Sequence, residues 1–541
     1  MASNDLGGLT RREFLLATVA AATLAACGND GDGGGEGAEG TTSSTTTSAP
    51  APVFESDPFT LGVASGDPLD DRVVLWTMLR PEGELPDGDV DVRWEVALDA
   101  GMTDVVADGT AVAVAALGHS VHVDVTGLEA DTEYHYRFSV GEHETTPART
   151  RTFAAAGTTP ERFTFAFSSC QNWEQGYYAA YRDVADTGDL DAFVFLGDYI
   201  YEYASRDYAD ERGRVTGQDF ECETVDQYRQ RYALYRSDAK LQSAHAHVPW
   251  IITWDDHEVD NDYAAAINQD DTPEAEFLDR RAAAYQVWYE FMPVRLEPPT
   301  GPDYAIYRSF AHGDLIRFHV LDTRQYRSDQ QRGEAFIEQI GDAVQVRMEG
   351  EPGRTMLGEE QRTWLLDGAE ASSAVWDVLA QQVFMFGGSA IAGAEPPIVV
   401  VDTWDGYADE RRAVLDALAG SVDNLVVLTG DFHSAAVADL RADPFDQSLP
   451  VIGSEFMATS ISSSFFDDDE AVESLVAAAI QTNPQIKWFD DRRGYTRCEV
   501  TPERWTSTYR VVDDQFDEDS DCTDASTWEV VAGTPGVRQL A

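Results

Sequence analysis

The most informative segment reads Ala192-Phe193-Val194-Phe195-Leu196-Gly197-Asp198-Tyr199-Ile200-Tyr201-Glu202. Its apolar first half predicts a short buried strand, and the glycine that follows predicts a tight turn carrying an acidic side chain. Similar apolar runs recur at 163–167, 250–254 and 425–429, and helical patterns occur at 273–292 and 407–419. Buried strands alternating with helices predict a layered α/β fold for residues 160–515.

Each of the four apolar runs leads into side chains that bind metals or transfer protons. The segments concerned are Ser168-Ser169-Cys170-Gln171, Gly197-Asp198-x-x-Tyr201, Asp255-Asp256-His257-Glu258-Val259-Asp260-Asn261 and Gly430-Asp431-Phe432-His433. In open α/β sheets, sites are built beyond the carboxyl ends of the strands. One such segment alone would be weak evidence, but four in order predict a single site.

Two of the candidate ligands form an unusual pair of donors. Cys170 offers a thiolate and Tyr201 a phenolate, and Asp198 sits on a turn where its carboxylate can bridge two cations. Two anionic donors of this kind favour a strongly Lewis-acidic trivalent ion, so we predict Fe³⁺. Zn²⁺ accepts thiolates as well, but phenolate is an uncommon zinc ligand.

The remaining acidic side chains are hard oxygen donors. Asp256 and Asp431, with Asn261 nearby, suit Ca²⁺ better than Mg²⁺ or Mn²⁺. Two cations that share Asp198 would lower the pKa of a bridging water and hold a phosphoryl group. The pattern therefore predicts a two-metal site for phosphate esters.

The net charge of the chain disfavours one class of partner, nucleic acids. The 541 residues contain 38 Lys and Arg against 97 Asp and Glu, a formal net charge of −59. Such a chain repels phosphate backbones at long range, which argues against a nucleic-acid-binding role. It suits cation binding or a high-salt habitat, where screening reduces self-repulsion. Its length predicts two to four domains.

The amino terminus predicts export. Residues 1–26 contain the pair Arg11-Arg12 and an apolar run that ends at Leu24-Ala25-Ala26, directly before Cys27. This pattern is typical of a twin-arginine signal peptide followed by a lipoprotein cleavage site. Cys27 is the predicted lipid-attachment residue, and residues 27–55 form a flexible tether rich in Gly, Ser and Thr. We expect export by the twin-arginine machinery and a lipid anchor on the outer face of the cytoplasmic membrane.

Residues 56–156 have the texture of an all-β region. Strand-like stretches occur at 73–76, 92–96 and 122–125, and Tyr134 resembles the corner tyrosine of a fibronectin-III-like sandwich, whose hydroxyl ties back to the preceding backbone. No reactive cluster is visible here, so a positioning role is predicted. Residues 516–541 are expected to pack on the catalytic domain as a tail, with a disulfide between Cys498 and Cys522 as one suggestion.

The motifs together resemble those of PhoD-type alkaline phosphatases, within the calcineurin-like metallophosphoesterase superfamily. The four segments quoted above match that family in order, and the resemblance spans about residues 60–530. Three further segments add to it: Leu321-Asp322-Thr323-Arg324, Leu357-Gly358-x-x-Gln361-x-x-Trp364-Leu365 and Asp405-Gly406-Tyr407-x-x-Glu410-Arg411. The resemblance implies a sandwich of β-sheets flanked by helices, one Fe³⁺ and one or two Ca²⁺.

By position, the resemblance assigns the ligands. Iron would be held by Cys170, Asp198, Tyr201 and His433, and calcium by Asp198, Asp256 and Asp431, with Asn261 on a calcium or the phosphate. Two residues that are usually histidine in the superfamily are here Cys170 and Asp431, which disfavours a Zn/Zn or Mn/Mn pair.

The implied reaction is hydrolysis of phosphomonoesters, and of diesters as well, by a metal-bound hydroxide or oxide. His257 occupies the position of the acid–base histidine. Arg324 is a candidate phosphate ligand because guanidinium groups bind phosphate bidentately, and an ion pair within an acidic protein is the equal alternative for it. Two alternatives stay open: a phospholipase D-like phosphodiesterase acting on phospholipids, and a surface-binding lipoprotein without catalysis. The binding lipoprotein predicts no convergence of the metal-capable residues.

Overall fold

The computed structural model describes residues 54–270, 272–330, 344–346, 353–389, 397–464 and 480–540, with 344–346 as backbone only. The predicted signal peptide, Cys27 and nearly all of the tether lie outside these ranges. Within them, no helix is both long and apolar enough to cross a membrane.

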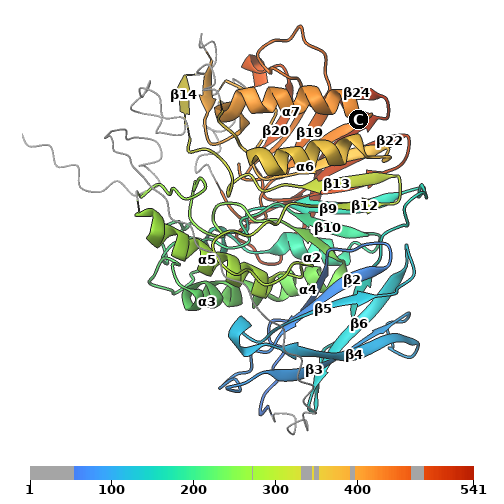
Figure 1. The fold of residues 1–541 in the computed structure, drawn as a ribbon, viewed down its shortest axis with the longest axis vertical. Helices are drawn as coiled ribbons and strands as arrows, with labels where there is room; N and C mark the ends of the chain where they lie inside the picture. The colour runs from blue at the N-terminus through green and yellow to red at the C-terminus, as the bar shows by residue number, and fades with distance from the viewer. Residues whose placement is uncertain are drawn as a thin grey trace, which may run out of the picture.

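Two large sheets form the centre of the molecule (Figure 1). The first has ten strands, in the order β24 (Thr534–Gln539), β23 (Cys522–Val531), β22 (Arg504–Val512), β21 (Gly494–Val500), β9 (Phe163–Ser168), β10 (Ala192–Phe195), β11 (Trp250–Ile252), β1 (Val63–Gly66), β2 (Arg72–Met78) and β5 (Ser120–Thr126). The second has seven, in the order β12 (Arg308–His312), β13 (Ile316–Val320), β15 (Trp376–Ala380), β17 (Leu425–Thr429), β19 (Gly453–Met457), β18 (Ala435–Leu440) and β20 (Ile486–Asp490).

A shared apolar core lies between the two sheets. Phe165 and Phe167 of β9 belong to the same buried cluster as Phe318 of β13 and Val426 of β17. The helices α2 (Ala179–Asp186), α3 (Val225–Arg236), α4 (Ala239–His247) and α5 (Glu274–Phe291) cover the other face of the ten-stranded sheet. The helices α6 (Gly358–Glu370) and α7 (Ala408–Ser421) cover the seven-stranded sheet. The predicted α/β layering and both predicted helices are therefore confirmed.

The four motif-bearing strands do not all lie in one sheet. β9, β10 and β11 are parallel neighbours in the ten-stranded sheet, whereas β17 lies in the facing sheet between β15 and β19. The site therefore forms where the carboxyl ends of strands from both sheets meet. Local periodicity predicts a buried strand but not which of two packed sheets receives it.

The amino-terminal region has a core of its own but shares a sheet with the rest. A second small sheet, β4 (Val105–Ala113), β3 (Val90–Ala97), β6 (Glu133–Val140), β7 (His143–Glu144) and β8 (Ala148–Arg151), packs over β1, β2 and β5. The backbone N–H of Glu129 donates to the Tyr134 hydroxyl at 2.8 Å, which confirms the predicted corner tyrosine.

The two regions are joined because β1 pairs with β11 in parallel, at Gly66 opposite Trp250. A Cβ atom at Gly66 would lie 2.3 Å from the carbonyl oxygen of Pro293, so only glycine permits this approach. The sequence pattern alone suggested a separate sandwich, because strand pairing across 184 positions leaves no local signal.

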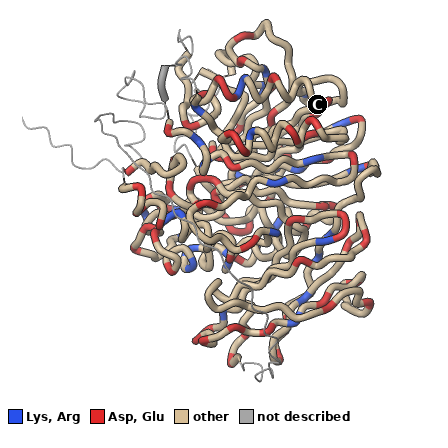
Figure 2. Tube along the Cα trace, viewed as in Figure 1, with Lys and Arg blue, Asp and Glu red and all other residues tan. Residues whose placement is uncertain are grey.

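Acidic residues are spread along the chain in both regions rather than gathered on one face (Figure 2). Many of them pair with arginines, as Asp67 does with Arg308 at 2.8 Å. The excess negative charge is therefore a general property of the molecule. Exposed acidic residues do not mark a site, whereas a cluster of buried carboxylates would.

Candidate metal centre

Three residues from three strand ends converge on one point. One potential ligand atom from each of Cys170, Asp198 and His433 lies within 4.8 Å of the other two, and all three residues are buried. They follow β9, β10 and β17, respectively. The surface-binding alternative predicted no such convergence, so the structure argues against it.

A second group of side chains shares the central carboxylate. Asp198, Asp256 and His257 meet the same 4.8 Å criterion, as do Asp255, Asp256 and Asp431. Asp198 thus belongs to a soft-donor group with Cys170 and to an oxygen-rich group with Asp256. This is the geometry expected of two cation positions with one bridging carboxylate.

The donor set fits metal ions because it is incomplete without them. Oδ1 of Asp198 and Oδ2 of Asp255 are buried and have no hydrogen-bond partner among the described residues. Buried carboxylate oxygens are normally hydrogen-bonded, paired with a cation or coordinated to a metal.

The backbone is strained at the candidate ligands. Cys170, Asp198, Asp431 and His433 all have positive φ, at 56°, 58°, 62° and 53°. Non-glycine residues rarely adopt this region, and such strain gathers at functional sites. Four instances in one cluster show that the loops are shaped to aim these side chains at a common centre.

Gly197 permits the closest contact between two of the loops. A Cβ atom there would lie 2.5 Å from both the backbone nitrogen and Cβ of Asp255. The Gly-Asp pair in the second motif thus has a steric cause: glycine lets the Asp198 turn lie directly against the Asp255 turn.

The Tyr201 hydroxyl reaches both neighbouring candidate ligands. Its Oη lies 3.1 Å from Oδ2 of Asp198 and 2.9 Å from Nε2 of His433. Burial, together with the nearby Arg493 guanidinium, lowers the pKa of His433 to about 3. Its imidazole is therefore neutral, which is the form that binds metals.

Burial and crowding raise the proton affinity of the acidic cluster. Burial raises the pKa of Asp198 well above its usual range, and the Asp256 and Asp255 carboxylates add to the rise, although His257 opposes it. Burial and the neighbouring Asp255 raise the pKa of Asp431 in the same way. Bound cations would offset this repulsion, so metal binding and deprotonation of the cluster are coupled.

His257 is held by a residue to which the sequence analysis gave no role. Its Nδ1 lies 2.8 Å from Oε2 of the fully buried Glu202, and the Asn261 backbone N–H donates to Oε1 of Glu202 at 3.0 Å. Burial alone would lower the pKa of His257, but Glu202, Asp198 and Asp256 raise it well above its usual range. Glu202 stands in the first quoted motif, yet nothing in the local pattern shows that it reaches His257.

Glu258 ties two of the loops together. Its Oε2 accepts from the backbone N–H groups of Asp198 and Asp255, at 3.0 and 2.8 Å, and its Oε1 accepts from that of Tyr199 at 2.6 Å. The acidic residue after His257 therefore positions the backbone of the site instead of facing its centre.

Arg324 meets carboxylates where a phosphate contact was predicted. Its Nε bonds Asp255, its Nη1 lies 2.7 Å from Oδ2 of Asp402, and its Nη2 lies 2.8 Å from Oδ1 of Asp431. The side chain is fully buried. In the structure it balances the charge of the acidic group and holds those side chains in place.

Asn261 lies at the margin of the site. Its side-chain nitrogen donates to Oε1 of Gln269 at 3.2 Å, so in the structure the amide contacts Gln269. The next residue does contact the cluster, because the backbone N–H of Asp262 donates to Oδ2 of Asp256 at 2.7 Å.

The segment after β19 supplies a fifth part of the site. The Ile461 backbone N–H donates to the Ser169 carbonyl at 3.0 Å, and the Ser463 hydroxyl donates to Tyr201 Oη at 2.8 Å. The sequence offers only a weak signal here, a cluster of serines after the mixed polar and apolar stretch 453–457, and serine is not a typical metal ligand.

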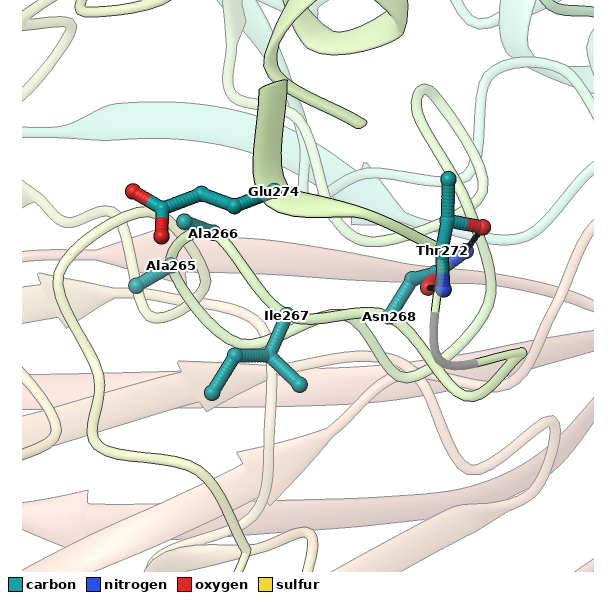
Figure 3. Close-up of a pocket in the computed structure, with 6 residues that line it drawn as sticks. All are labelled: Ala265, Ala266, Ile267, Asn268, Thr272 and Glu274. Carbon is teal, nitrogen blue, oxygen red and sulfur yellow. Dashed lines mark hydrogen bonds between the residues drawn. The ribbon is translucent and has the colours of Figure 1, made fainter. Parts of the chain in front are cut away.

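A hollow of about 420 Å³ lies on the loop that follows the Asp256–His257 motif (Figure 3). Its walls come from Ala265, Ala266, Ile267, Asn268, Thr272 and Glu274. The hollow is therefore lined mainly by apolar and neutral polar side chains, with Glu274 as its one acidic residue.

The suggested disulfide is wrong. The four cysteines that the structure describes, Cys170, Cys222, Cys498 and Cys522, are all free. Cys498 pairs across strands with Ser507 and Cys522 with Val512, so the two lie at different heights along β22. Spacing in sequence could not reveal that a whole strand separates them.

Comparison with known proteins agrees with this geometry. A family model described as PhoD-like phosphatase matches residues 165–509, and one for the PhoD-like phosphatase N-terminal domain matches residues 44–154. The chain belongs to the PhoD-like phosphatase family. As a member it is a phosphoric ester hydrolase, and its amino-terminal region is that family's own leading domain.

Relatives within the PhoD-like phosphatases span most of the chain. It is 45% identical over 474 residues to alkaline phosphatase D of Bacillus subtilis (strain 168), covering 85% of this chain and 79% of that protein. A solved structure titled "Structure of PhoD" superimposes with a TM-score of 0.84 at 42% identity, covering 91% of this chain and 94% of that one. The resemblance inferred from the motifs is confirmed.

Proposed function

We propose that this PhoD-like phosphatase is an exported, metal-dependent enzyme that hydrolyses phosphomonoesters, and diesters as well. The observation that carries the proposal is the sharing of Asp198 between the Cys170–His433 group and the Asp256 group. A shared carboxylate between a soft and a hard donor set suits two unlike cations. Family membership supports the substrate class.

The proposed ligands divide between the two donor sets. Cys170, Asp198, Tyr201 and His433 hold one Fe³⁺, and Asp198, Asp256 and Asp431, with Asn261 from the margin, hold one or two Ca²⁺. When bound, these cations polarise the phosphoryl group and supply a water of lowered pKa. Arg324 keeps Asp255 and Asp431 oriented toward them.

His257 is the proposed general acid. Glu202 bonds Nδ1 of His257 and favours the protonated ring. Nε2 of His257 is the nitrogen proposed to donate a proton to the leaving group. The proton would pass to the departing alkoxide, which needs it because free alkoxides are poor leaving groups. Glu202 thus acts through His257 as a positioning residue.

A substrate panel tests this function. Nitrophenyl phosphate, bis-nitrophenyl phosphate and phosphatidylcholine vesicles are compared at equal enzyme concentration, with Asp198→Asn protein as the blank. We expect cleavage of the monoester and of the soluble diester, with release of inorganic phosphate from the monoester. If phosphatidylcholine alone were cleaved, the enzyme would be a phospholipase D-like phosphodiesterase instead.

The proposal also covers the cellular location of the enzyme and the division of the chain into signal, tether and domains. We infer that residues 1–26 are a twin-arginine signal, that 27–55 tether the enzyme to a lipid on Cys27, and that it works on the outer face of the cytoplasmic membrane. Residues 56–156 form a fibronectin-III-like region that shares β1, β2 and β5 with the ten-stranded sheet, and 160–515 form the metallophosphoesterase domain. Residues 516–541, expected as a tail packing on that domain, supply the strands β23 and β24 of the same sheet. The motif Leu24-Ala25-Ala26-Cys27 supports the anchor.

Replacement of Cys27 tests the anchor. The Cys27→Ser variant is expected to move from the membrane fraction to the soluble extracytoplasmic fraction, since the lipid acceptor is gone, while its specific activity stays unchanged. Fractionation with an activity assay measures both. A variant that remained on the membrane would place the anchor elsewhere.

A further inference from the structure

Ser463 contacts the candidate iron ligand Tyr201 from the segment that follows β19. Its Oγ lies 2.8 Å from Tyr201 Oη, and the side chain is completely buried. The two residues are 262 positions apart in the chain. Ser463 is not itself a typical metal ligand, so any effect on the site is exerted through Tyr201.

A second contact occupies one lone pair of the Ser463 hydroxyl oxygen. The backbone N–H of Asn172 donates to Ser463 Oγ at 3.0 Å, and a backbone N–H can only donate. The single proton of Ser463 is therefore available for Tyr201 Oη. The proton of Tyr201 faces Asp198 Oδ2 or His433 Nε2, and it would be released to solvent if the oxygen served as a metal ligand.

The backbone of Ser463 is fixed on two sides. Its carbonyl oxygen accepts from Arg493 and, at 2.5 Å, from Ser460 Oγ, while its N–H donates to the Cys170 carbonyl at 3.3 Å. Arg493 is buried and also donates to the His433 carbonyl at 2.6 Å. The Arg493 guanidinium thus holds in place both Ser463 and His433, the candidate metal ligand next to Tyr201.

We propose that Ser463 is a positioning residue that donates a hydrogen bond to the deprotonated oxygen of Tyr201 and tunes it as an iron ligand. The inference rests on the proposed Fe³⁺ site. A hydrogen bond to an anionic oxygen stabilises its filled orbitals. It therefore raises the energy of charge transfer from phenolate to iron. Hydrogen bonds to ligands commonly change metal affinity or activity by about 10–100-fold.

The test compares three variants of the full-length protein loaded with saturating iron. Ser463→Ala removes the donor, and Ser463→Thr keeps a hydroxyl. Ser462→Ala is the matched control, because Ser462 is equally buried in the same segment but donates to the Asn172 carbonyl at 2.7 Å instead. Visible absorption, iron content and Tm are measured for each.

We expect the absorption maximum of Ser463→Ala to move to longer wavelength, and its iron affinity to fall about 10–100-fold. Ser463→Thr and Ser462→Ala should keep the wild-type maximum. An unchanged maximum in Ser463→Ala, with iron bound, overturns the inference alone. Iron lost from Ser463→Ala and Ser462→Ala alike would mean that the segment only supports the fold. A colourless, iron-free, active wild type overturns the proposed Fe³⁺ site and this inference with it.

Discussion

The Asp198→Asn variant is expected to lose both metals and, on every substrate, activity on the order of 10³-fold or more. Asp198 is the one residue common to the Cys170–His433 group and the Asp256 group, and its Oδ1 is buried without a partner among the described residues. An amide in its place keeps the shape but binds cations weakly and cannot bridge them as an anion. Elemental analysis and kcat on nitrophenyl phosphate measure the two losses.

The control for this change is Asp377→Asn. Asp377 is also buried and lies 3.1 Å from Nε2 of His319, but it belongs to β15, outside the convergent groups. Its variant should keep metal content and kcat, whatever its effect on Tm. If Asp198→Asn retained both metals and full activity, the bridging role would be wrong.

The His257→Asn variant is expected to keep its metals and to lose about 10²–10⁴-fold in kcat on alkyl phosphates. The loss on nitrophenyl phosphate should be much smaller, because nitrophenolate departs without a proton. The structural basis is the buried Glu202–His257 contact of 2.8 Å, which favours a protonated ring beside Asp198 and Asp256. Rates on paired leaving groups measure the difference.

Two outcomes would change the assignment of His257. Equal losses on both leaving groups, with metals retained, would indicate transition-state binding in place of proton donation. Loss of metal would make His257 a ligand, which its proximity to Asp198 and Asp256 permits. Glu202→Gln serves as the matched variant: it keeps a polar partner but removes the charge, so it should show the same leaving-group dependence to a smaller degree.

Local patterns predicted the elements and most of the cluster. The run 192–196 gave β10, and the turn at Gly197 correctly placed Asp198 at the end of a strand. Convergence of Cys170 and Asp198 followed from one physical rule, that parallel strands of one sheet present their carboxyl ends together. His433 joins them from β17 in the facing sheet, which the rule does not predict.

The remaining features depend on contacts between distant parts of the chain. Ser463 and Tyr201 are 262 positions apart, and Glu202 reaches His257 across 55. For Arg324 the sequence left a phosphate ligand and an ion pair equally open, and the fold shows ion pairs with Asp255 and Asp431. Periodicity reports which face of an element is buried, but not which side chain of another element it meets.

Metal analysis of protein purified without chelator distinguishes a bridged pair of unlike cations from a site that holds one kind of metal. Elemental analysis is combined with visible absorption on the same active sample. We predict one iron and one or two calcium ions per chain, with an absorption band that disappears in Tyr201→Phe. Fully active, colourless protein containing only zinc would contradict the account.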